Sequence, residues 1–158
     1  MDTGSAAVLG ALEDPLVRSQ RESLLCNIGN FHTLAFHLAQ ERIVGIFEHH
    51  TGEIDRAQLE QMLMKLAEGI LTNEEVFNTS GHGALILDNA AQNGVNKGFP
   101  FLAVTGPRRE MLRGSALHPY EATPHGDMML AGCFGLLRAC ADHQPVIASL
   151  IEPSLLKV

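Results

Sequence analysis

The sequence predicts an α/β domain in which helices flank a mixed sheet of five strands. Three short apolar runs follow one another with only polar or glycine-containing turns between them, over 24–26, 33–38 and 43–47. A segment with leucine and methionine at helical spacing comes next, over 55–69. Two further apolar runs lie beyond it, over 84–87 and 99–104. Short apolar runs bounded by turn residues are typical of strands, and the 3.6-residue period is typical of a helix.

The order of these elements indicates the topology. Three consecutive strands with tight turns form an antiparallel meander. Strands that are reached through helical crossovers are expected to be parallel to the first strand. The result is an α/β sandwich built like a ribonuclease-H-type domain.

Two segments are predicted to be helices, and the C-terminal tail is predicted to be a strand. The helix over 55–69 ends at Gly69, a typical stop signal. The segment 127–141 is apolar nearly all round, so we expect a helix that is buried on most of its surface. Its glycines, Gly132 and Gly135, would permit close packing against a neighbour. The tail over 146–151 is expected to add an edge strand.

These elements divide the chain into three parts. Residues 1–23 are expected to be an N-terminal connector with a short helix, and its charged part, 13–23, contains Pro15 and is typical of a surface segment. The ribonuclease-H-like domain spans 24–145 and includes a polar loop over 88–98. A C-terminal tail follows over 146–158.

Composition limits the function and the compartment. The net charge of -7 argues against a nucleic-acid partner. No apolar run reaches the ~18 residues of a membrane span, and the N-terminus lacks the basic start of a signal peptide. The three cysteines stand in apolar context, which favours buried free thiols in a reducing compartment. We therefore expect a cytoplasmic protein.

The first candidate site is the turn between the first two strands. Residues Asn27, Gly29, Asn30, His32 and Thr33 stand there. A strand-end turn with a glycine and a threonine hydroxyl can offer backbone N–H groups to a phosphate. A plain hairpin turn is the alternative, because such residues form hairpins in any case.

A second candidate lies at the end of the strand over 99–104. Thr105 and Gly106 are followed by Pro107, Arg108 and Arg109 at the expected start of a short helix. A helix N-terminus with two arginines favours an anion. Solvated arginines after a proline turn are the alternative.

The third candidate is a set of histidines. The chain has 8 histidines, and several stand beside glycine or acidic residues. If the strand ends converge, a metal set of His49, His50, His82, His125 and Asp127 would meet at one rim, with Glu48 beside it. Such nitrogen and oxygen ligands suit Zn, Mn or Fe. No HExxH spacing is present, and histidines that hydrogen-bond loop backbone are the alternative.

These segments resemble a prokaryotic family whose members often carry the name pyruvate formate-lyase activating enzyme. The strings that carry the resemblance are NIGNFHTLAF, GIFEHHTG, LTNEEVFNTSGHGA, VTGPRR and PHGDMMLAGCFGLLRA. The resemblance extends over about 2–141.

The resemblance implies a divergent branch of the actin, sugar kinase and chaperone ATPase superfamily, of which this chain is similar to the C-terminal half. In that superfamily the first hairpin of the second half contacts nucleotide phosphates, and Asn27, Gly29, Asn30 and Thr33 stand in those places. Asn27 replaces the usual Asp, which removes a charge that would act on magnesium-bound water. A later strand end holds the adenosine, and 105–107 is the match.

The enzyme name in this family implies different chemistry. A glycyl-radical activase resembles radical S-adenosylmethionine enzymes, which carry three cysteines at CxxxCxxC spacing. The cysteines here are Cys26, Cys133 and Cys140, so no iron–sulfur cluster is expected. GxSxG, GxxxxGK[ST] and GxGxxG motifs are also absent from the sequence.

The leading hypothesis is therefore a nucleotide-binding half-domain that takes ATP with Mg²⁺ and needs an N-terminal half-domain or a homo-oligomer to complete its cleft. Its substrate stays open. Two alternatives come from other classes: a metal-dependent hydrolase-like site made by the histidines with Zn or Mn, and a non-catalytic assembly module built on the apolar helix over 127–141.

Overall fold

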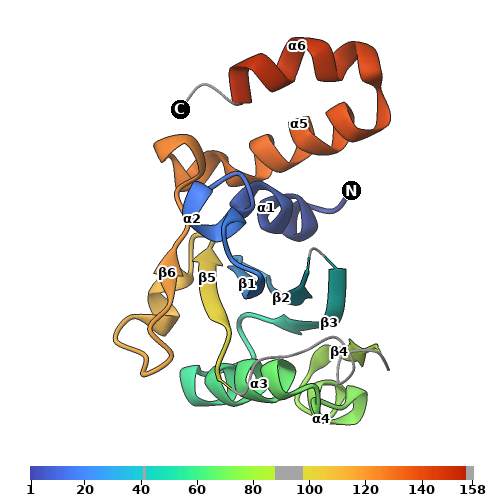
Figure 1. The fold of residues 1–158 in the computed structure, drawn as a ribbon. Coiled ribbons are helices and arrows are strands. Elements are labelled where there is room, and N and C mark those ends of the chain that lie inside the picture. The colour runs from blue at the N-terminus through green and yellow to red at the C-terminus, as the bar shows by residue number, and fades with distance from the viewer. Residues whose placement is uncertain (41, 88–97, 156–158) are drawn as a thin grey trace.

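The computed structural model describes residues 1–40, 42–87 and 98–155. One mixed sheet lies between helices on both of its faces (Figure 1). Helices α1 (Thr3–Ala11) and α2 (Pro15–Arg18) cover one face, and α3 (Arg56–Glu68) covers the other. The last two helices, α5 (Ala131–His143) and α6 (Pro145–Leu155), form an outer layer beyond α1 (Figure 1). The α/β prediction is confirmed.

Over the described residues the sheet has six strands, one more than predicted, in the order β4-β3-β2-β1-β5-β6. Their bounds are β1 Glu22–Ile28, β2 His32–Ala39, β3 Arg42–His50, β4 Gly81–Ile86, β5 Phe101–Thr105 and β6 Tyr120–Glu121. The predicted meander of β1, β2 and β3 is confirmed, and β5 is parallel to β1 as expected. The added strand is β6, only two residues long and parallel to β5.

Strand β4 does not follow the prediction that it is parallel to β1. It pairs antiparallel with β3, and Gly81 lies opposite His49. The connection between them holds α3 and α4 (Asn73–Phe77). The chain therefore returns to the end of the sheet that it left, and β4 runs back along β3.

Helix α3 confirms the prediction for 55–69 closely. Asp55 and Gln58 form a reciprocal capping box at its start, and Gly69 ends it at φ 70°. Its apolar side is buried against the sheet in the larger core cluster. That cluster includes Leu24, Cys26, Ile28, Phe47, Leu59, Leu63, Leu66, Val76, Leu102 and Val104. This core fixes the α3 face of β1, β3 and β5.

Helix α5 (Ala131–His143) is less buried than its sequence predicts. Only Ala131, Gly135 and Ala141 are buried, while Leu136 is 47% exposed. The reason is its place in the fold, because α5 packs on α1 rather than on the sheet. At Gly135, α5 passes so close to α1 that a Cβ on this residue would lie 1.9 Å from the Ala6 carbonyl oxygen.

The C-terminal tail forms a helix, α6 (Pro145–Leu155), and the predicted edge strand over 146–151 is wrong. A short apolar run fits a strand and a buried helix equally well by periodicity. Pro145 favours the helix, since its fixed φ suits a first helical position. The loop expected over 88–98 lies outside the described residues except for Gly98.

The cysteines are all free, but they are not all buried. Cys26 is 1% exposed in β1, and burial raises its pKa to about 12. Cys133 and Cys140 are exposed on α5. The prediction of three buried thiols is therefore correct only for Cys26, again because α5 is an outer helix.

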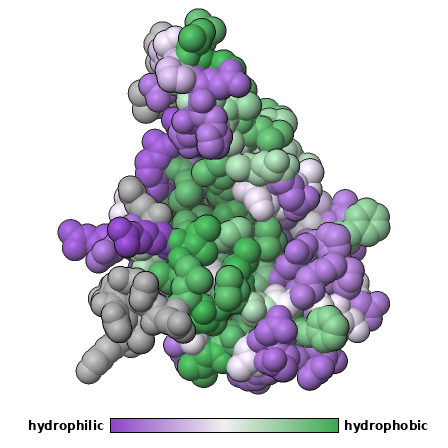
Figure 2. All heavy atoms as spheres, turned by 90° about the vertical axis from the view of Figure 1, so that its right-hand side faces the viewer, coloured by the Kyte–Doolittle hydropathy of each residue, from purple (hydrophilic) through white to green (hydrophobic). Residues whose placement is uncertain are grey.

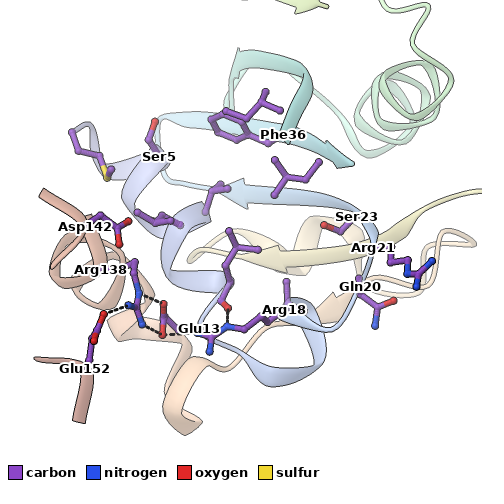
Figure 3. A pocket seen from close by; sticks show the side chains of 17 residues that line it. Ser5, Glu13, Arg18, Gln20, Arg21, Ser23, Phe36, Arg138, Asp142 and Glu152 are labelled. Carbon is purple, nitrogen blue, oxygen red and sulfur yellow. Dashed lines mark hydrogen bonds and ion pairs between the residues drawn. The ribbon is translucent and has the colours of Figure 1, made fainter. Parts of the chain in front are cut away.

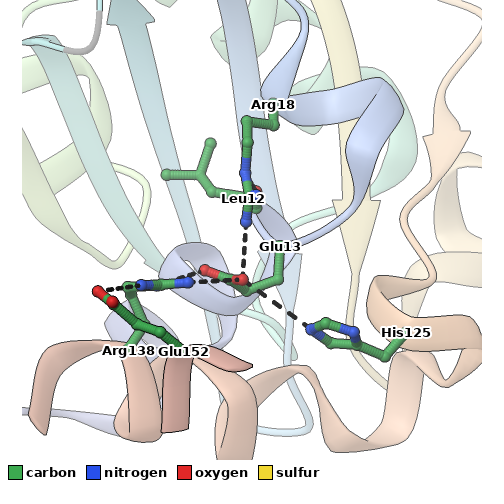
Figure 4. A network of polar contacts seen from close by, with 6 residues as sticks. All are labelled: Leu12, Glu13, Arg18, His125, Arg138 and Glu152. Carbon is green, nitrogen blue, oxygen red and sulfur yellow. Dashed lines mark hydrogen bonds and ion pairs between the residues drawn. The ribbon is translucent and has the colours of Figure 1, made fainter. Parts of the chain in front are cut away.

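The N-terminal segment is tied to the rest by a buried carboxylate (Figure 4). Glu13, whose side chain is 3% exposed, accepts hydrogen bonds from Arg18 at 2.7 Å and from Arg138 of α5 at 2.7 Å and 3.1 Å. His125 lies 3.9 Å away. Residues expected on the surface thus hold α1, α2 and α5 together. No helix in the described ranges is long and apolar enough to cross a bilayer.

Candidate functional site

The predicted phosphate and adenosine segments lie together at one end of the sheet. Strands β1, β3 and β5 end there, and β2 and β4 begin there, because β2 and β4 run antiparallel to their neighbours. This arrangement brings together the turns at 27–33, 50–51, 80–82 and 105–109. Strand ends of α/β sheets are common ligand sites, because loops there are positioned by a rigid scaffold.

The hairpin between β1 and β2 presents a small polar tip. The Gly29 N–H donates to the His32 carbonyl oxygen at 2.9 Å and closes the turn. Asn30 and His32 are exposed, and Phe31 is 80% exposed. Thr33 differs, since it is buried and its hydroxyl lies 2.9 Å from that of Thr51. Thr33 thus anchors the hairpin, while Asn30 and His32 face solvent.

The segment over 105–107, which is predicted to contact the adenosine side of a nucleotide, is hydrogen-bonded directly to this hairpin. Thr105 lies beside Asn27 in parallel register, and its hydroxyl donates to Asn27 Oδ1 at 3.2 Å. The Arg108 N–H donates to the Ile28 carbonyl oxygen at 3.0 Å. Gly106 has φ +97°, and a Cβ there would lie 2.4 Å from that same oxygen. A glycine is therefore required where the two segments meet.

The arginines after Gly106 have different surroundings. Arg109 is held by Glu121 at 2.9 Å and by the Gly106 carbonyl oxygen at 3.2 Å. Arg108 is exposed, and no described residue pairs with its guanidinium. The predicted helix here is a single 3₁₀ turn, Arg109–Leu112, and is too short for a helix-terminal anion site. The positive charge near the hairpin comes from Arg108.

Three histidines converge at the same end of the sheet, beside the hairpin. His32, His50 and His82 each offer one ring nitrogen, and these atoms lie within 4.8 Å of one another. The ring centroids are 5.1 Å apart for His32 and His50, 4.9 Å for His32 and His82, and 4.4 Å for His50 and His82. The Glu48 carboxylate lies 3.7 Å from His32 Nδ1. His32, predicted with the phosphate turn, thus joins two residues of the predicted metal set.

The backbone explains this convergence. His32 and His50 are directly opposite each other across β2 and β3, so their side chains share a face. His82 is the extra residue of a register shift, because Glu48 pairs with Gly83 but His49 pairs with Gly81. Such a β-bulge redirects a side chain.

The glycines on either side of His82 make this bulge possible. Gly83 has φ +133°, and a Cβ there would lie 2.3 Å from Asn73 Oδ1. A Cβ on Gly81 would lie 2.6 Å from the ring of His49. The sequence Gly-His-Gly is therefore a packing requirement that sets the position of His82.

The remaining residues of the predicted metal set lie elsewhere. His49 is fully buried on the other face of β3, where Nδ1 lies 2.9 Å from the His50 carbonyl oxygen and Nε2 lies 3.2 Å from the Thr79 hydroxyl. His125 lies beside Glu13 and packs on Phe134. Asp127 accepts a hydrogen bond from the Met129 N–H at 2.8 Å.

A separate pocket of about 970 Å³ lies on the α1 face of the sheet, and no sequence motif pointed to it (Figure 3). Its apolar lining comes from Val8, Leu12, Phe36, Leu38 and Ile43, and its charged lining from Glu13, Arg18, Arg21, Arg138 and Asp142. Apolar side chains are also gathered on the surface view from the β3 and β4 side (Figure 2). None of the predicted site residues lines this pocket.

A family model described as "Putative pyruvate format-lyase activating enzyme" matches residues 1–111. The chain belongs to this family. No curated protein and no solved structure matches it. The family match includes the hairpin, the three converging histidines and Gly106, whereas the string over 124–139 lies beyond it.

The residues do not fit the iron–sulfur cluster that the family description implies. Cys26 is enclosed in β1, and Cys133 and Cys140 are exposed on α5, which packs on α1. The three thiols do not form a group of close ligand atoms. A cluster needs three or four converging thiolates, so this chain's own cysteines do not form a site for one.

Proposed function

We propose that this chain is a nucleotide-binding half-domain of an actin-like ATPase or kinase type, which takes ATP with Mg²⁺. The hairpin over 27–33 contacts the phosphates, and the strand end over 105–107 contacts the adenosine side. One observation carries the proposal. Segments separated by 78 residues, each predicted to contact nucleotide, are joined by the bond from Thr105 to Asn27.

The sheet topology supports this proposal. With β4 set aside, the strand order is β3-β2-β1-β5-β6, in which an antiparallel meander is followed by strands parallel to β1. The meander and the parallel strand β5 are features that the ribonuclease-H-type prediction includes, whereas the antiparallel β4 is not. Both nucleotide segments then lie at the carboxyl ends of the adjacent parallel strands β1 and β5, where α/β sheets commonly bind ligands.

The electrostatics of this end agree with a phosphate ligand. The chain as a whole carries a net charge of -7, yet the exposed Arg108 lies next to the hairpin without an acidic partner among the described residues. Asn27 is neutral and accepts from Thr105, so it adds no negative charge that would repel a phosphate. The same neutrality leaves Mg²⁺ to be held mainly by the nucleotide.

The openness of the hairpin sets the expected affinity. Asn30 and Phe31 project into solvent at its tip. Tight small-molecule sites bury most of the ligand surface. We therefore propose that a second lobe, supplied by an N-terminal half-domain or by another copy, covers the other side of the nucleotide, and that this chain alone binds ATP weakly.

Backbone amide NMR with the chain alone tests this function, because it detects millimolar affinities. Titration with MgATP should shift amides in 27–33 and 105–109 and few elsewhere. Arg108→Glu should abolish these shifts, since it reverses the unpaired charge. Arg42→Glu makes the same charge change on an exposed residue at the opposite end of the sheet and should leave the shifts intact. Absence of shifts in these segments, or equal effects of both variants, would contradict the proposal.

A further inference from the structure

We infer that His32, His50 and His82 form a binding site for a divalent transition-metal ion of the Zn²⁺ class. This site shares His32 with the proposed phosphate hairpin, but its binding of a metal ion does not depend on the nucleotide function. It rests on three side chains from three strands whose ring nitrogens lie within 4.8 Å of one another.

The distances suit metal binding after a small closure. With Zn–N bonds of about 2.0–2.1 Å and tetrahedral geometry, ligand nitrogens lie about 3.3 Å apart. The present separations, at most 4.8 Å, need to shorten by about 1.5 Å or less. Rotation of exposed or half-buried imidazole rings covers such a change without moving the strands.

The rings have no better partners in the described part of the chain. Neither His50 nor His82 makes a side-chain hydrogen bond there, and His32 approaches only Glu48, at 3.7 Å. The ring planes meet at 41°, 80° and 53°, so a flat aromatic stack does not explain the arrangement. The lone pairs of three neighbouring imidazoles gain a partner when a cation binds between them.

The backbone positions these ligands in advance. Two of the three stand on a rigid cross-strand pair, and the third is directed by a bulge whose glycines cannot be replaced without a clash. Sites held on strands are more precise than sites on loops. Glu48 supplies a carboxylate that can orient His32, as carboxylates commonly do for histidine ligands.

The ligand chemistry selects the ion. Neutral imidazoles prefer Zn²⁺ and its neighbours in the first transition row, whereas Mg²⁺ and Ca²⁺ prefer oxygen ligands. Three protein ligands leave a fourth tetrahedral position for water or for an oxygen of another molecule. The site thus has the donor set of a catalytic zinc centre rather than of a closed structural one.

Isothermal titration of the purified, metal-free chain with ZnCl₂ tests the inference. We expect one ion per chain, at micromolar affinity or better, with MgCl₂ giving no heat. His82→Ala and His50→Ala should each weaken Zn²⁺ binding by at least ~10-fold, because even the loss of a group that only supports a ligand typically costs about 10-fold or more. His143→Ala, an exposed histidine at the end of α5, is the matched control and should leave the affinity unchanged.

One further measurement distinguishes this site from Zn²⁺ binding at the exposed thiols of α5. The double variant Cys133→Ser, Cys140→Ser should bind Zn²⁺ as the parent does. Binding that is lost in this cysteine variant but kept in His82→Ala, or no Zn²⁺ binding by the folded parent chain, would overturn the inference.

Discussion

Five of the 8 histidines fall into two groups with opposite surroundings. His37 and His49 are buried, and both nitrogens of each ring have partners. His37 contacts Glu22 at 3.0 Å and the Leu66 carbonyl oxygen at 3.2 Å, while His49 contacts Thr79 and the His50 carbonyl oxygen. The rim group of His32, His50 and His82 is exposed or half-buried, and its three ring nitrogens lie within 4.8 Å of one another. A buried histidine here stabilises the fold, and a rim histidine is available to a ligand.

His49 and His50 are the sharpest case, because they are neighbours in sequence. Successive side chains of a strand point to opposite faces. His49 has the parity of Phe47, which is 1% exposed in the α3-side core, and His50 therefore points away from that core. A step of one residue along β3 therefore leads from a buried structural histidine, His49, to a candidate ligand, His50.

The largest effect that this comparison predicts is on stability at His49. His49→Ala should lower the free energy of unfolding by about 2–4 kcal/mol, because it leaves a cavity and an unpaired carbonyl group. His50→Ala should cost less than about 1 kcal/mol, as is usual for a partly exposed side chain. Urea unfolding followed by circular dichroism measures both. Equal losses would remove the distinction between the two groups.

Parity in β3 is predictable from the sequence, and it would have separated His49 from His50. The helix over 55–69 is equally predictable, since Leu59, Leu63 and Leu66 repeat at helical spacing and Gly69 ends it. Cap and stop residues act locally, so sequence alone specifies them.

The position of His82 is not predictable in this way. It depends on a register shift between β3 and β4, and on the return of the chain through α3 and α4 to the sheet edge beside β3. Register follows from packing between segments far apart in sequence. The exposure of α5 has a similar origin, because only the tertiary fold shows that this apolar helix packs on α1.

A second prediction concerns Glu13, a buried group whose partners are charged. Burial by itself raises the pKa of this carboxyl, but the hydrogen bonds and charges of Arg138 and Arg18 lower it by more, so the net pKa is below 4.5. The ionised form is favoured by folding. Its contribution to stability is therefore present above about pH 4.5 and is lost as the pH falls through the lower pKa of the folded state.

Glu13→Gln should accordingly destabilise the protein by about 2 kcal/mol at neutral pH, because two arginines lose their buried partner. The difference from the parent should shrink as the pH is lowered below 4.5. Glu121→Gln, whose side chain is 53% exposed in its pair with Arg109, is the control and should cost less than about 1 kcal/mol. Urea unfolding at several pH values checks this. A pH-independent loss in Glu13→Gln would contradict the assignment.

A third effect is expected at the bulge. Gly83→Ala should cost about 1–3 kcal/mol, since φ +133° is strained for any residue with a Cβ, and should also weaken Zn²⁺ binding by displacing His82. Gly52→Ala is the matched control, because a Cβ there meets nothing within 4 Å. Thermal unfolding and zinc titration of both variants measure the two effects. Unchanged zinc affinity in Gly83→Ala would show that the bulge does not position His82.

The most direct test of the distinction is ¹H–¹⁵N NMR of the histidine rings during a ZnCl₂ titration. The signals of all 8 histidines can be followed in one sample. We predict that His32, His50 and His82 change together and saturate at one equivalent of Zn²⁺, while His37 and His49 keep their signals. Changes at His49, or small changes spread over the exposed histidines without saturation, would contradict the account.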